Sequence, residues 1–388
     1  MTGDMTQRMG GGGMTQTLAD GTTQTLGAGQ GMAPRGATQA TGGGDQLSGA
    51  GAMSQTLGRA VSMERPTRKF TMLSRTADNL FWMARYMERA EFLARTIEAA
   101  QRLSALPTAY NEHGTEWESA LESSGMSEAF HAKYGTAEAD SVVDFLTFDA
   151  SNPSSIRNCI EAARTNGRAV RTALTAEMWE AINGAWLEVK KFEDALKSGS
   201  DWREEVPRFL DFVKQTSLLF DGSMIRTMLR DPSFWFSRLG VFVERADNTA
   251  RILDVKYHVL LPDTETVGGS LDYFQWAAIL RAVSALTAYH WIYRESIKPW
   301  LIADLLILRS EMPRSLLSCY ENIVSCLDSL GKAYGRQGGA QRLARKTMAQ
   351  LENASIGGLF QSGLHEFITT FIDDNNRLGV SISEQYLV

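Results

Sequence analysis

The stretch Glu-Arg-Ala-Glu at residues 88–91 returns as Glu-Arg-Ala-Asp at residues 244–247, and this repetition organises the whole sequence. The agreement continues beyond it, because Ala-Arg at 94–95 matches Ala-Arg at 250–251 at the same separation of 156 residues. Self-similarity at a fixed separation is typical of repeated structural units. The two stretches therefore predict that the chain contains two related halves.

A second pair of blocks agrees at a separation of 160 residues. Pro-Ser-Ser-Ile at 153–156 corresponds to Pro-Arg-Ser-Leu at 313–316. Two pairs of blocks in the same order and at nearly the same separation predict a tandem duplication. We place the repeats at residues 71–230 and 231–388 and expect them to be related by a pseudo-twofold axis.

The spacing of apolar residues predicts an all-α fold. Residues 74–103 place Leu80, Ala84, Met87 and Ala94 on one stripe, as in an amphipathic helix. No stretch alternates at period two for long enough to predict a strand, and residues 107–137 read as a long connection with short helical pieces. The same analysis, helped by a cap-then-proline start at Asn152-Pro153 and Asp231-Pro232, predicts further helices over 152–174, 175–196, 207–229, 232–259, 271–295, 313–331, 338–353 and 359–377.

Residues 1–70 differ from the rest in composition. They hold 16 of the 34 glycines before position 60 and no aromatic residue before Phe70, and they contain near-copies of Met-Thr-Gln-Thr-Leu at 14–18, 23–26 and 53–57. So few bulky apolar groups cannot offset the cost of ordering the backbone. We predict a disordered tail, which is either a spacer or an arm for docking or modification.

Composition also limits the classes of function. A net charge of −6 among 388 residues, without long runs of one sign, argues against a nucleic-acid-binding protein. Three cysteines do not form a disulfide scaffold, and the longest apolar run, 301–308, is broken by Asp304, so we expect no membrane span. With no basic-then-apolar leader pattern, we expect a cytoplasmic protein.

The repeated Glu-Arg pairs lie beside a stripe of small residues, where two helices can approach closely. A buried ion needs a partner. Neighbouring residues on a helix diverge by about 100°, so Glu88 and Arg89 cannot easily satisfy each other. If the two matched helices pack about the pseudo-twofold axis, Glu88 meets Arg245 and Glu244 meets Arg89. Within each helix, the acid-first i,i+4 spacing adds two more pairs, Glu91 with Arg95 and Asp247 with Arg251.

Two interpretations of this cluster stay open. It is either a structural ion-pair network that fixes how the halves dock, or a site in which carboxylates and guanidinium groups hold a zwitterion such as a peptide end, or perturb one another's pKa for acid–base chemistry.

Three other patterns in the sequence concern possible ligand sites. Arg164, Arg168 and Arg171 at i, i+4 and i+7 form a candidate anion-binding face, although a solvated face with Glu161 as partner is the alternative. A two-metal helical site needs two Glu-x-x-His motifs, and only residues 128–131 have this spacing, so we expect no metal. Glycine-rich stretches lack the strand before and helix after that a phosphate-binding loop needs, and we expect no cofactor.

The sequence resembles the bacterial alpha-E family through Leu-Ser-Arg at 73–75, Tyr-Met-Glu-Arg-Ala-Glu at 86–91, Asn-Pro-Ser-Ser-Ile at 152–156, Pro-Arg-Ser at 313–315 and the second Glu-Arg at 244–245. The resemblance covers about residues 71–388 and implies an all-helical, usually duplicated domain named for its Glu-Arg motif. The second copy departs from the first, since it has Asp247 in place of Glu91, and Ser-Arg at 237–238 in place of Phe-Trp at 81–82.

The resemblance also implies a context. Proteins like this are typically encoded beside circularly permuted ATP-grasp ligases, transglutaminase-like proteins and proteasome-like peptidases, in systems inferred to make or modify peptides. We therefore expect a non-catalytic helical partner protein that binds the ATP-grasp-type ligase, a transglutaminase-like protein or a peptide. The alternative is an enzyme or peptide-binding protein that uses a cleft lined by Glu and Arg between the two repeats.

Overall fold

The computed structural model describes residues 15–17, 23–25, 72–106, 115–258 and 270–387. Contacts divide the chain into two units, Met1–Pro66 and Thr67–Val388. The predicted disordered tail therefore lies almost wholly outside the described residues, as does the start of the predicted connection at 107–114.

Within the first unit, two short strands pair with each other. β1 (Thr15–Thr17) and β2 (Thr23–Thr25) are antiparallel, with Thr15 opposite Thr25 and Gln16 opposite Gln24. Both strands are Thr-Gln-Thr, and they belong to the near-copies found in the sequence. These six residues lie before residue 71, outside the predicted helical body, and their β-branched threonines favour extended backbone.

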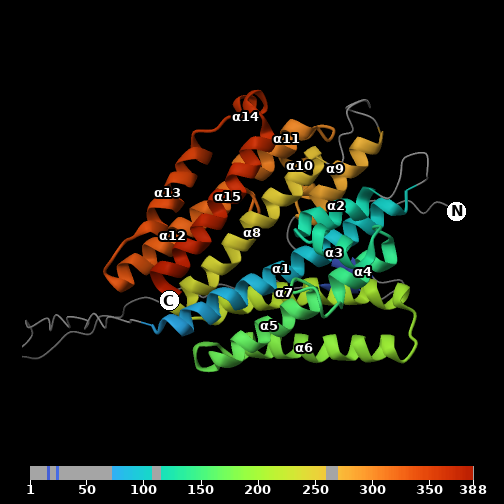
Figure 1. Ribbon diagram of the computed structural model, residues 1–388, viewed down its shortest axis with the longest axis horizontal. Helices are drawn as coiled ribbons and strands as arrows, with labels where there is room; N and C mark the ends of the chain where they lie inside the picture. Colours follow the sequence, from blue (N-terminus) through green and yellow to red (C-terminus); the bar gives the residue numbers. More distant parts are fainter. Residues whose placement is uncertain (1–14, 18–22, 26–71, 107–114, 259–269, 388) are drawn as a thin grey trace, which may run out of the picture. The chain divides into compact units, whose positions relative to one another are not determined.

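The described residues of the second unit are helical and contain no strand (Figure 1). The two longest helices at its centre are α1 (Ser74–Ser104) and α8 (Pro232–His258). The others are α2 (Thr115–Ser124), α3 (Ser127–Tyr134), α4 (Ala139–Thr147), α5 (Ile156–Ala169), the 3₁₀-helix η2 (Arg171–Ala173), α6 (Ala176–Lys197), α7 (Trp202–Thr227), α9 (Ser270–Ala282), α10 (Leu286–Tyr293), α11 (Pro299–Ala303), the π-helix η3 (Asp304–Leu308), α12 (Leu316–Tyr334), α13 (Gly339–Glu352), α14 (Ile356–Ser362), α15 (Leu364–Ile382) and the π-helix η4 (Ser383–Leu387).

Helices α1 and α8 pack directly against each other, as the stripe of small residues predicts. A Cβ atom added to Gly240 would lie 2.2 Å from the carbonyl oxygen of Phe81 and 3.2 Å from the Cβ of Ala84. Only glycine permits so close an approach of two backbones. The other elements cover this pair: α5, α7 and α9 pack on α1, whereas α12 and α15 pack on α8.

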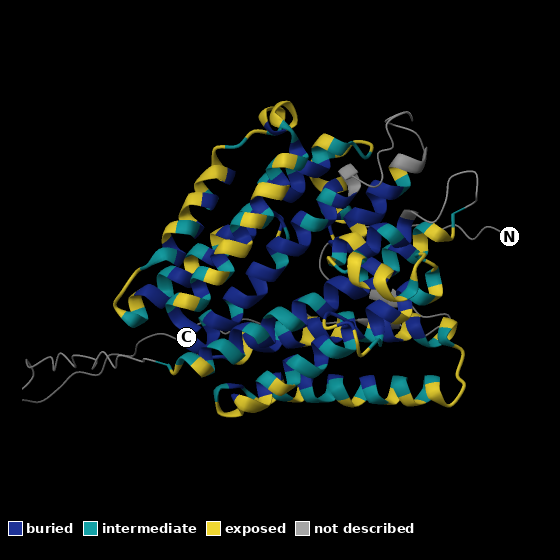
Figure 2. Ribbon diagram, in the orientation of Figure 1, coloured by how far each residue is buried: buried dark blue, intermediate teal, exposed yellow. Residues whose placement is uncertain are grey.

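Buried apolar side chains form two clusters along α1. One includes Leu80 and Phe236 and extends from the start of α1 through α8 and α12 to α15. The other includes Ile97 and Phe209 and lies where the end of α1 meets α4, α5, α6 and α7. Figure 2 shows buried residues concentrated on the inner helices, while α6 and α13 present exposed outer faces. Glu88 and Glu244 thus lie on two helices that are packed on several sides.

Several predicted helix boundaries need correction. Helix α5 begins at Ile156 rather than 152, because the hydroxyl of Ser155, not the side chain of Asn152, accepts the capping hydrogen bond from Asn158. Ser315, which matches Ser155 in sequence, caps α12 in the same way. Asp201 caps α7, so Pro207 lies inside that helix.

Two helices predicted as continuous are broken by left-handed backbone. The predicted helix 271–295 is divided into α9 and α10 near Ser284, whose φ is 56°. The predicted helix 359–377 is divided into α14 and α15 at Gly363, whose φ is 97°. Positive φ interrupts a right-handed helix, and serine gives no sequence signal for it.

Candidate functional site

The two Glu-Arg pairs exchange partners between α1 and α8. Arg245 donates to Glu88 through Nε and Nη2, both at 2.8 Å. Arg89 donates to Glu244 through Nε at 2.5 Å and Nη2 at 3.1 Å. Each contact is a two-pronged guanidinium–carboxylate pair, the geometry in which arginine binds carboxylate most strongly. The predicted reciprocal pairing is confirmed, and the role of the four residues stays a prediction.

Two further arginines, which sequence reasoning missed as partners, complete this ion-pair network. Arg314 donates from Nη1 to Glu88 and from Nη2 to Glu91, both at 2.8 Å. Arg85 donates from Nε to Glu244 at 2.8 Å, and its guanidinium group lies 4.7 Å from the ring centre of Trp82. Arg314 belongs to a repeated block, but no local signal indicates a partner more than 220 residues away.

The network holds its carboxylates ionised. Burial alone would raise the pKa of Glu88, but the guanidinium groups of Arg245 and Arg314 outweigh this and lower it to about 2. Likewise Glu244 is buried, yet Arg89 and Arg85 lower its pKa to about 2. A carboxylate with so low a pKa is a fixed charge near neutral pH and a poor proton donor or acceptor.

The predicted i,i+4 pairs are present, but their surroundings differ. Glu91 accepts from Arg95 at 2.7 Å through Oε1 and from Ser217 at 2.8 Å through Oε2. Asp247 accepts from Arg251 at 2.7 Å through Oδ2. The other carboxylate oxygen of Asp247, Oδ1, is buried and has no hydrogen-bond partner among the described residues. The residue as a whole is 8% exposed.

A cavity of about 180 Å³ lies beside Asp247, and we call it the inner cavity. One carboxylate–guanidinium pair of the network, Glu244 with Arg89, contributes to its wall. The wall includes residues of α1, of α2 and the turn after it, of the segment before α5, and of α8. They are Arg89, Phe92, Leu93, Ser123, Ser124, Gly125, Met126, Ser154, Glu244, Asp247, Asn248 and Arg251. Like Asp247 Oδ1, the amide Nδ2 of Asn248 is buried without a hydrogen-bond partner among the described residues.

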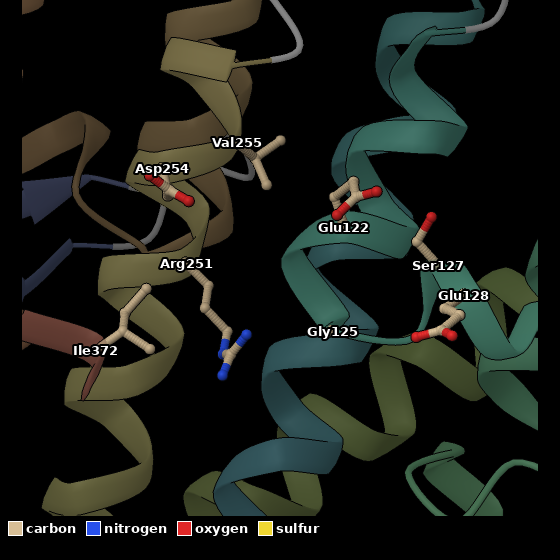
Figure 3. A pocket seen from close by; sticks show the side chains of 8 residues that line it. All are labelled: Glu122, Gly125, Ser127, Glu128, Arg251, Asp254, Val255 and Ile372. Carbon is tan, nitrogen blue, oxygen red and sulfur yellow. The ribbon is translucent and has the colours of Figure 1, made fainter. Parts of the chain in front are cut away.

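A larger cavity of about 690 Å³, the outer cavity, shares Gly125 and Arg251 with the inner one. Figure 3 shows that α8 forms one side of it and that the ends of α2 and α3 form the other, with Arg251 extending between them. Three carboxylates face this space. It is lined by Glu122, Gly125, Ser127, Glu128, Arg251, Asp254, Val255 and Ile372. His365 also contacts Asp254, at 2.6 Å.

The candidate anion-binding face is not formed as predicted. Helix α5 ends at Ala169, so Arg171 belongs to η2 and does not continue the face of Arg164 and Arg168. Arg164 donates to Asn183 at 2.9 Å, while the guanidinium of Arg171 lies over the ring of Trp179. The expected partner, Glu161, pairs instead with Arg157.

Other reactive groups are buried or scattered. All three cysteines are buried, and this burial raises the pKa of the Cys159, Cys319 and Cys326 thiols to about 12. In the Glu-x-x-His segment, His131 contacts Glu118 at 2.6 Å. Across the part of the chain that the structure describes, no three His, Cys, Asp or Glu side chains are grouped to hold a metal ion. Among the same residues, no helix has the length and apolar character needed to cross a membrane.

Comparison with known proteins gives one match. Residues 72–387 match a family described as a predicted alpha-helical domain with a conserved ER motif. The chain belongs to the alpha-E family. In this alpha-E protein, the two Glu-Arg dipeptides at 88–89 and 244–245 are paired with each other between α1 and α8. No curated protein and no solved structure matches the chain.

Proposed function

We propose that this alpha-E protein is a non-catalytic helical partner protein in a bacterial, cytoplasmic peptide synthesis or modification system. It binds the ATP-grasp-type ligase or transglutaminase-like protein of that system, or their peptide substrate. The context comes from the family resemblance, and the structure supplies two supporting features, which are the state of the Glu-Arg network and an exposed apolar surface.

The network supports a non-catalytic role because its buried carboxylates are already paired with arginines. Each carboxylate of the two Glu-Arg pairs accepts hydrogen bonds from two guanidinium groups. Both have pKa values of about 2, far from the neutral range that suits general acid–base catalysis. A buried, reciprocal network of this kind suits the fixing of helix register, a role for which buried charges are attested.

The single observation that carries the partner role is an apolar surface on α7. Leu218, Leu219 and Ile225 are 63%, 58% and 40% exposed, and Leu229, just beyond the helix, is 75% exposed. We call these four residues the α7 patch. Clustered exposed apolar side chains are typical of protein interaction sites, and an amphipathic partner helix can cover such a face.

Co-purification with the ATP-grasp-type ligase tests this proposal. The full-length wild type, a Leu218→Ser/Ile225→Ser variant and a Val380→Ser control are compared; Val380 is an apolar residue on α15 that is 59% exposed. We expect the wild type and the Val380→Ser protein to retain the ligase and the α7-patch variant to lose it. Equal retention by all three proteins contradicts the use of this patch, and no retention by the wild type contradicts the ligase as partner.

The alternative function, an enzyme or peptide-binding protein that uses the Glu-Arg cleft, has one specific observation in its favour. Arg89 and Glu244 line the inner cavity. Because both side chains already form ion pairs, we propose peptide binding rather than catalysis for this cavity. Turnover of a peptide by the isolated protein, lost in an Arg89→Met variant that remains folded, would instead support an enzyme.

A further inference from the structure

The ion-pair network shows how two carboxylates of one helix in this fold bind a guanidinium group. Arg314 donates one nitrogen to Glu88 and another to Glu91, residues three apart on α1. Glu244 and Asp247 are likewise three apart on α8, and both line the inner cavity. The position that matches Arg314 at a separation of 160 residues is Ser154, which also lines this cavity.

Serine is too short to do what Arg314 does. The hydroxyl of Ser154 lies 3.5 Å from Nη1 of Arg89, and the space beside it is the 180 Å³ inner cavity. At about 30 Å³ for each water molecule, this volume equals roughly six waters. It therefore accommodates a guanidinium group and the methylene groups next to it.

The acceptors in the cavity match a guanidinium donor. Asp247 Oδ1 is buried without a hydrogen-bond partner among the described residues, in a residue that is 92% buried. A buried charged acceptor without a donor is unfavourable, so a cation that donates to it is bound favourably. Glu88 Oε1 accepts hydrogen bonds from both Arg245 and Arg314. The matching oxygen of Glu244, Oε1, accepts from Nε of Arg89.

The neighbouring arginines leave two carboxylate oxygens for a further donor. Glu244 Oε2 accepts from both Arg85 and Arg89, whereas Glu244 Oε1 accepts from Arg89 alone among the described residues. Arg251 donates to Oδ2 of Asp247 and leaves Oδ1 open. Around Glu88 and Glu91, three guanidinium groups share two carboxylates: Glu88 pairs with Arg245 and Arg314, and Glu91 pairs with Arg95 and Arg314. The outer cavity adds Glu122, Glu128 and Asp254 to the approach, so its lining carries three carboxylates and one guanidinium group.

We infer that the inner cavity binds the guanidinium group of an arginine side chain in a peptide, whose backbone lies in the outer cavity. One nitrogen of the guanidinium donates to Asp247 Oδ1 and another to Glu244. The inference rests on the proposed peptide-binding role for its ligand, and its test requires no partner protein.

The first test is calorimetric titration of the full-length protein with acetyl-Gly-Arg-Gly-amide. The citrulline peptide is the matched control, because citrulline keeps the shape but loses the charge. We expect the arginine peptide to bind at least tenfold more tightly than the citrulline and lysine peptides, since one lysine ammonium cannot reproduce the forked geometry. An Asp247→Asn variant should lose at least tenfold in affinity, whereas Asp211→Asn, at an exposed acid, should retain it.

The second test fills the cavity from within. Ser154→Arg copies the block that contains Arg314, so it should raise the melting temperature and abolish binding of the arginine peptide. Ser154→Met adds bulk without charge and should block binding without raising the melting temperature.

Any of four results overturns the inference: no measurable binding of the arginine peptide, equally tight binding of the citrulline or lysine peptide, unchanged affinity in the Asp247→Asn variant, or a folded Ser154→Arg protein that still binds the arginine peptide. Failure of peptide binding alongside retained capture of the ligase leaves the partner proposal intact.

Discussion

Removing the charge of Glu88 tests how strongly the ion-pair network holds α1 against α8. The Glu88→Gln variant keeps the shape of the side chain but leaves Arg245 and Arg314 without their shared carboxylate. The pKa of Glu88 is lowered from 4.5 to about 2. At about 1.36 kcal/mol per pKa unit, this corresponds to roughly 3 kcal/mol of stabilisation near pH 7. Loss of one partner from a buried ion pair typically costs a similar ~3–5 kcal/mol.

The lowered pKa of Glu88 also predicts how the stability difference between the wild type and Glu88→Gln depends on pH. Because the pKa is lower in the folded protein, the stabilisation is fully present above pH 4.5 and is lost as the pH falls towards about 2. The gap in unfolding free energy between wild type and Glu88→Gln should therefore shrink from about 3 kcal/mol at pH 7 to about 1.5 kcal/mol near pH 3.

Urea denaturation followed by circular dichroism measures both quantities. Glu161→Gln is a suitable control, since Glu161 pairs with Arg157 at the surface with 45% of its side chain exposed. That substitution should cost only about 0–1 kcal/mol. A loss below about 1 kcal/mol for Glu88→Gln at pH 7, or a gap that does not shrink in acid, refutes the reasoning.

Three further predictions concern packing, reactivity and the loop before α5. Gly240→Ala places a methyl group against the Phe81 carbonyl and should lower the unfolding free energy by about 1–3 kcal/mol. The control Gly222→Ala, whose added Cβ has no atom within 4 Å, should not lower it. Equal effects of the two substitutions in urea denaturation argue against the close helix contact. The thiol of Cys319, whose pKa is raised to about 12, should resist a thiol reagent at pH 8 in the native protein and react with it in urea. Rapid labelling of Cys319 in the native protein contradicts its burial. Asn152→Ala removes the side-chain oxygen that accepts the hydrogen bond of the Ser154 amide. It should lower the melting temperature, with a loss of about 1–3 kcal/mol in unfolding free energy. An unchanged melting temperature contradicts the structural role of this side chain.

Local sequence patterns accounted for most of the helices because helical periodicity and capping are short-range. They misplaced the start of α5, since Asn152 and Ser155 are both good capping residues and only the folded chain shows that Ser155 caps it. Nothing in the sequence near Ser284 indicated its left-handed backbone. The tandem duplication stays a prediction, supported by the matched caps of α5 and α12.

The candidate site was predictable only where the repeats constrained it. The reciprocal pairing followed from repetition together with the cost of burying unpaired ions. The part played by Arg314 did not, because its partners are brought to it by tertiary packing from α1. The change from Glu91 to Asp247 was visible in the sequence, but its consequence, an unbonded oxygen beside a cavity, depends on how α2 and α8 pack.

The most direct test of the central claim, that reciprocal Glu-Arg pairs couple α1 to α8, is a double-mutant cycle. Unfolding free energies are measured for the wild type, Glu88→Gln, Arg245→Gln and the double variant. The 2.8 Å two-pronged contact predicts that the double variant loses less stability than the sum of the single losses, with a coupling energy of about 1–3 kcal/mol. Losses that add to within about 0.5 kcal/mol contradict the claim.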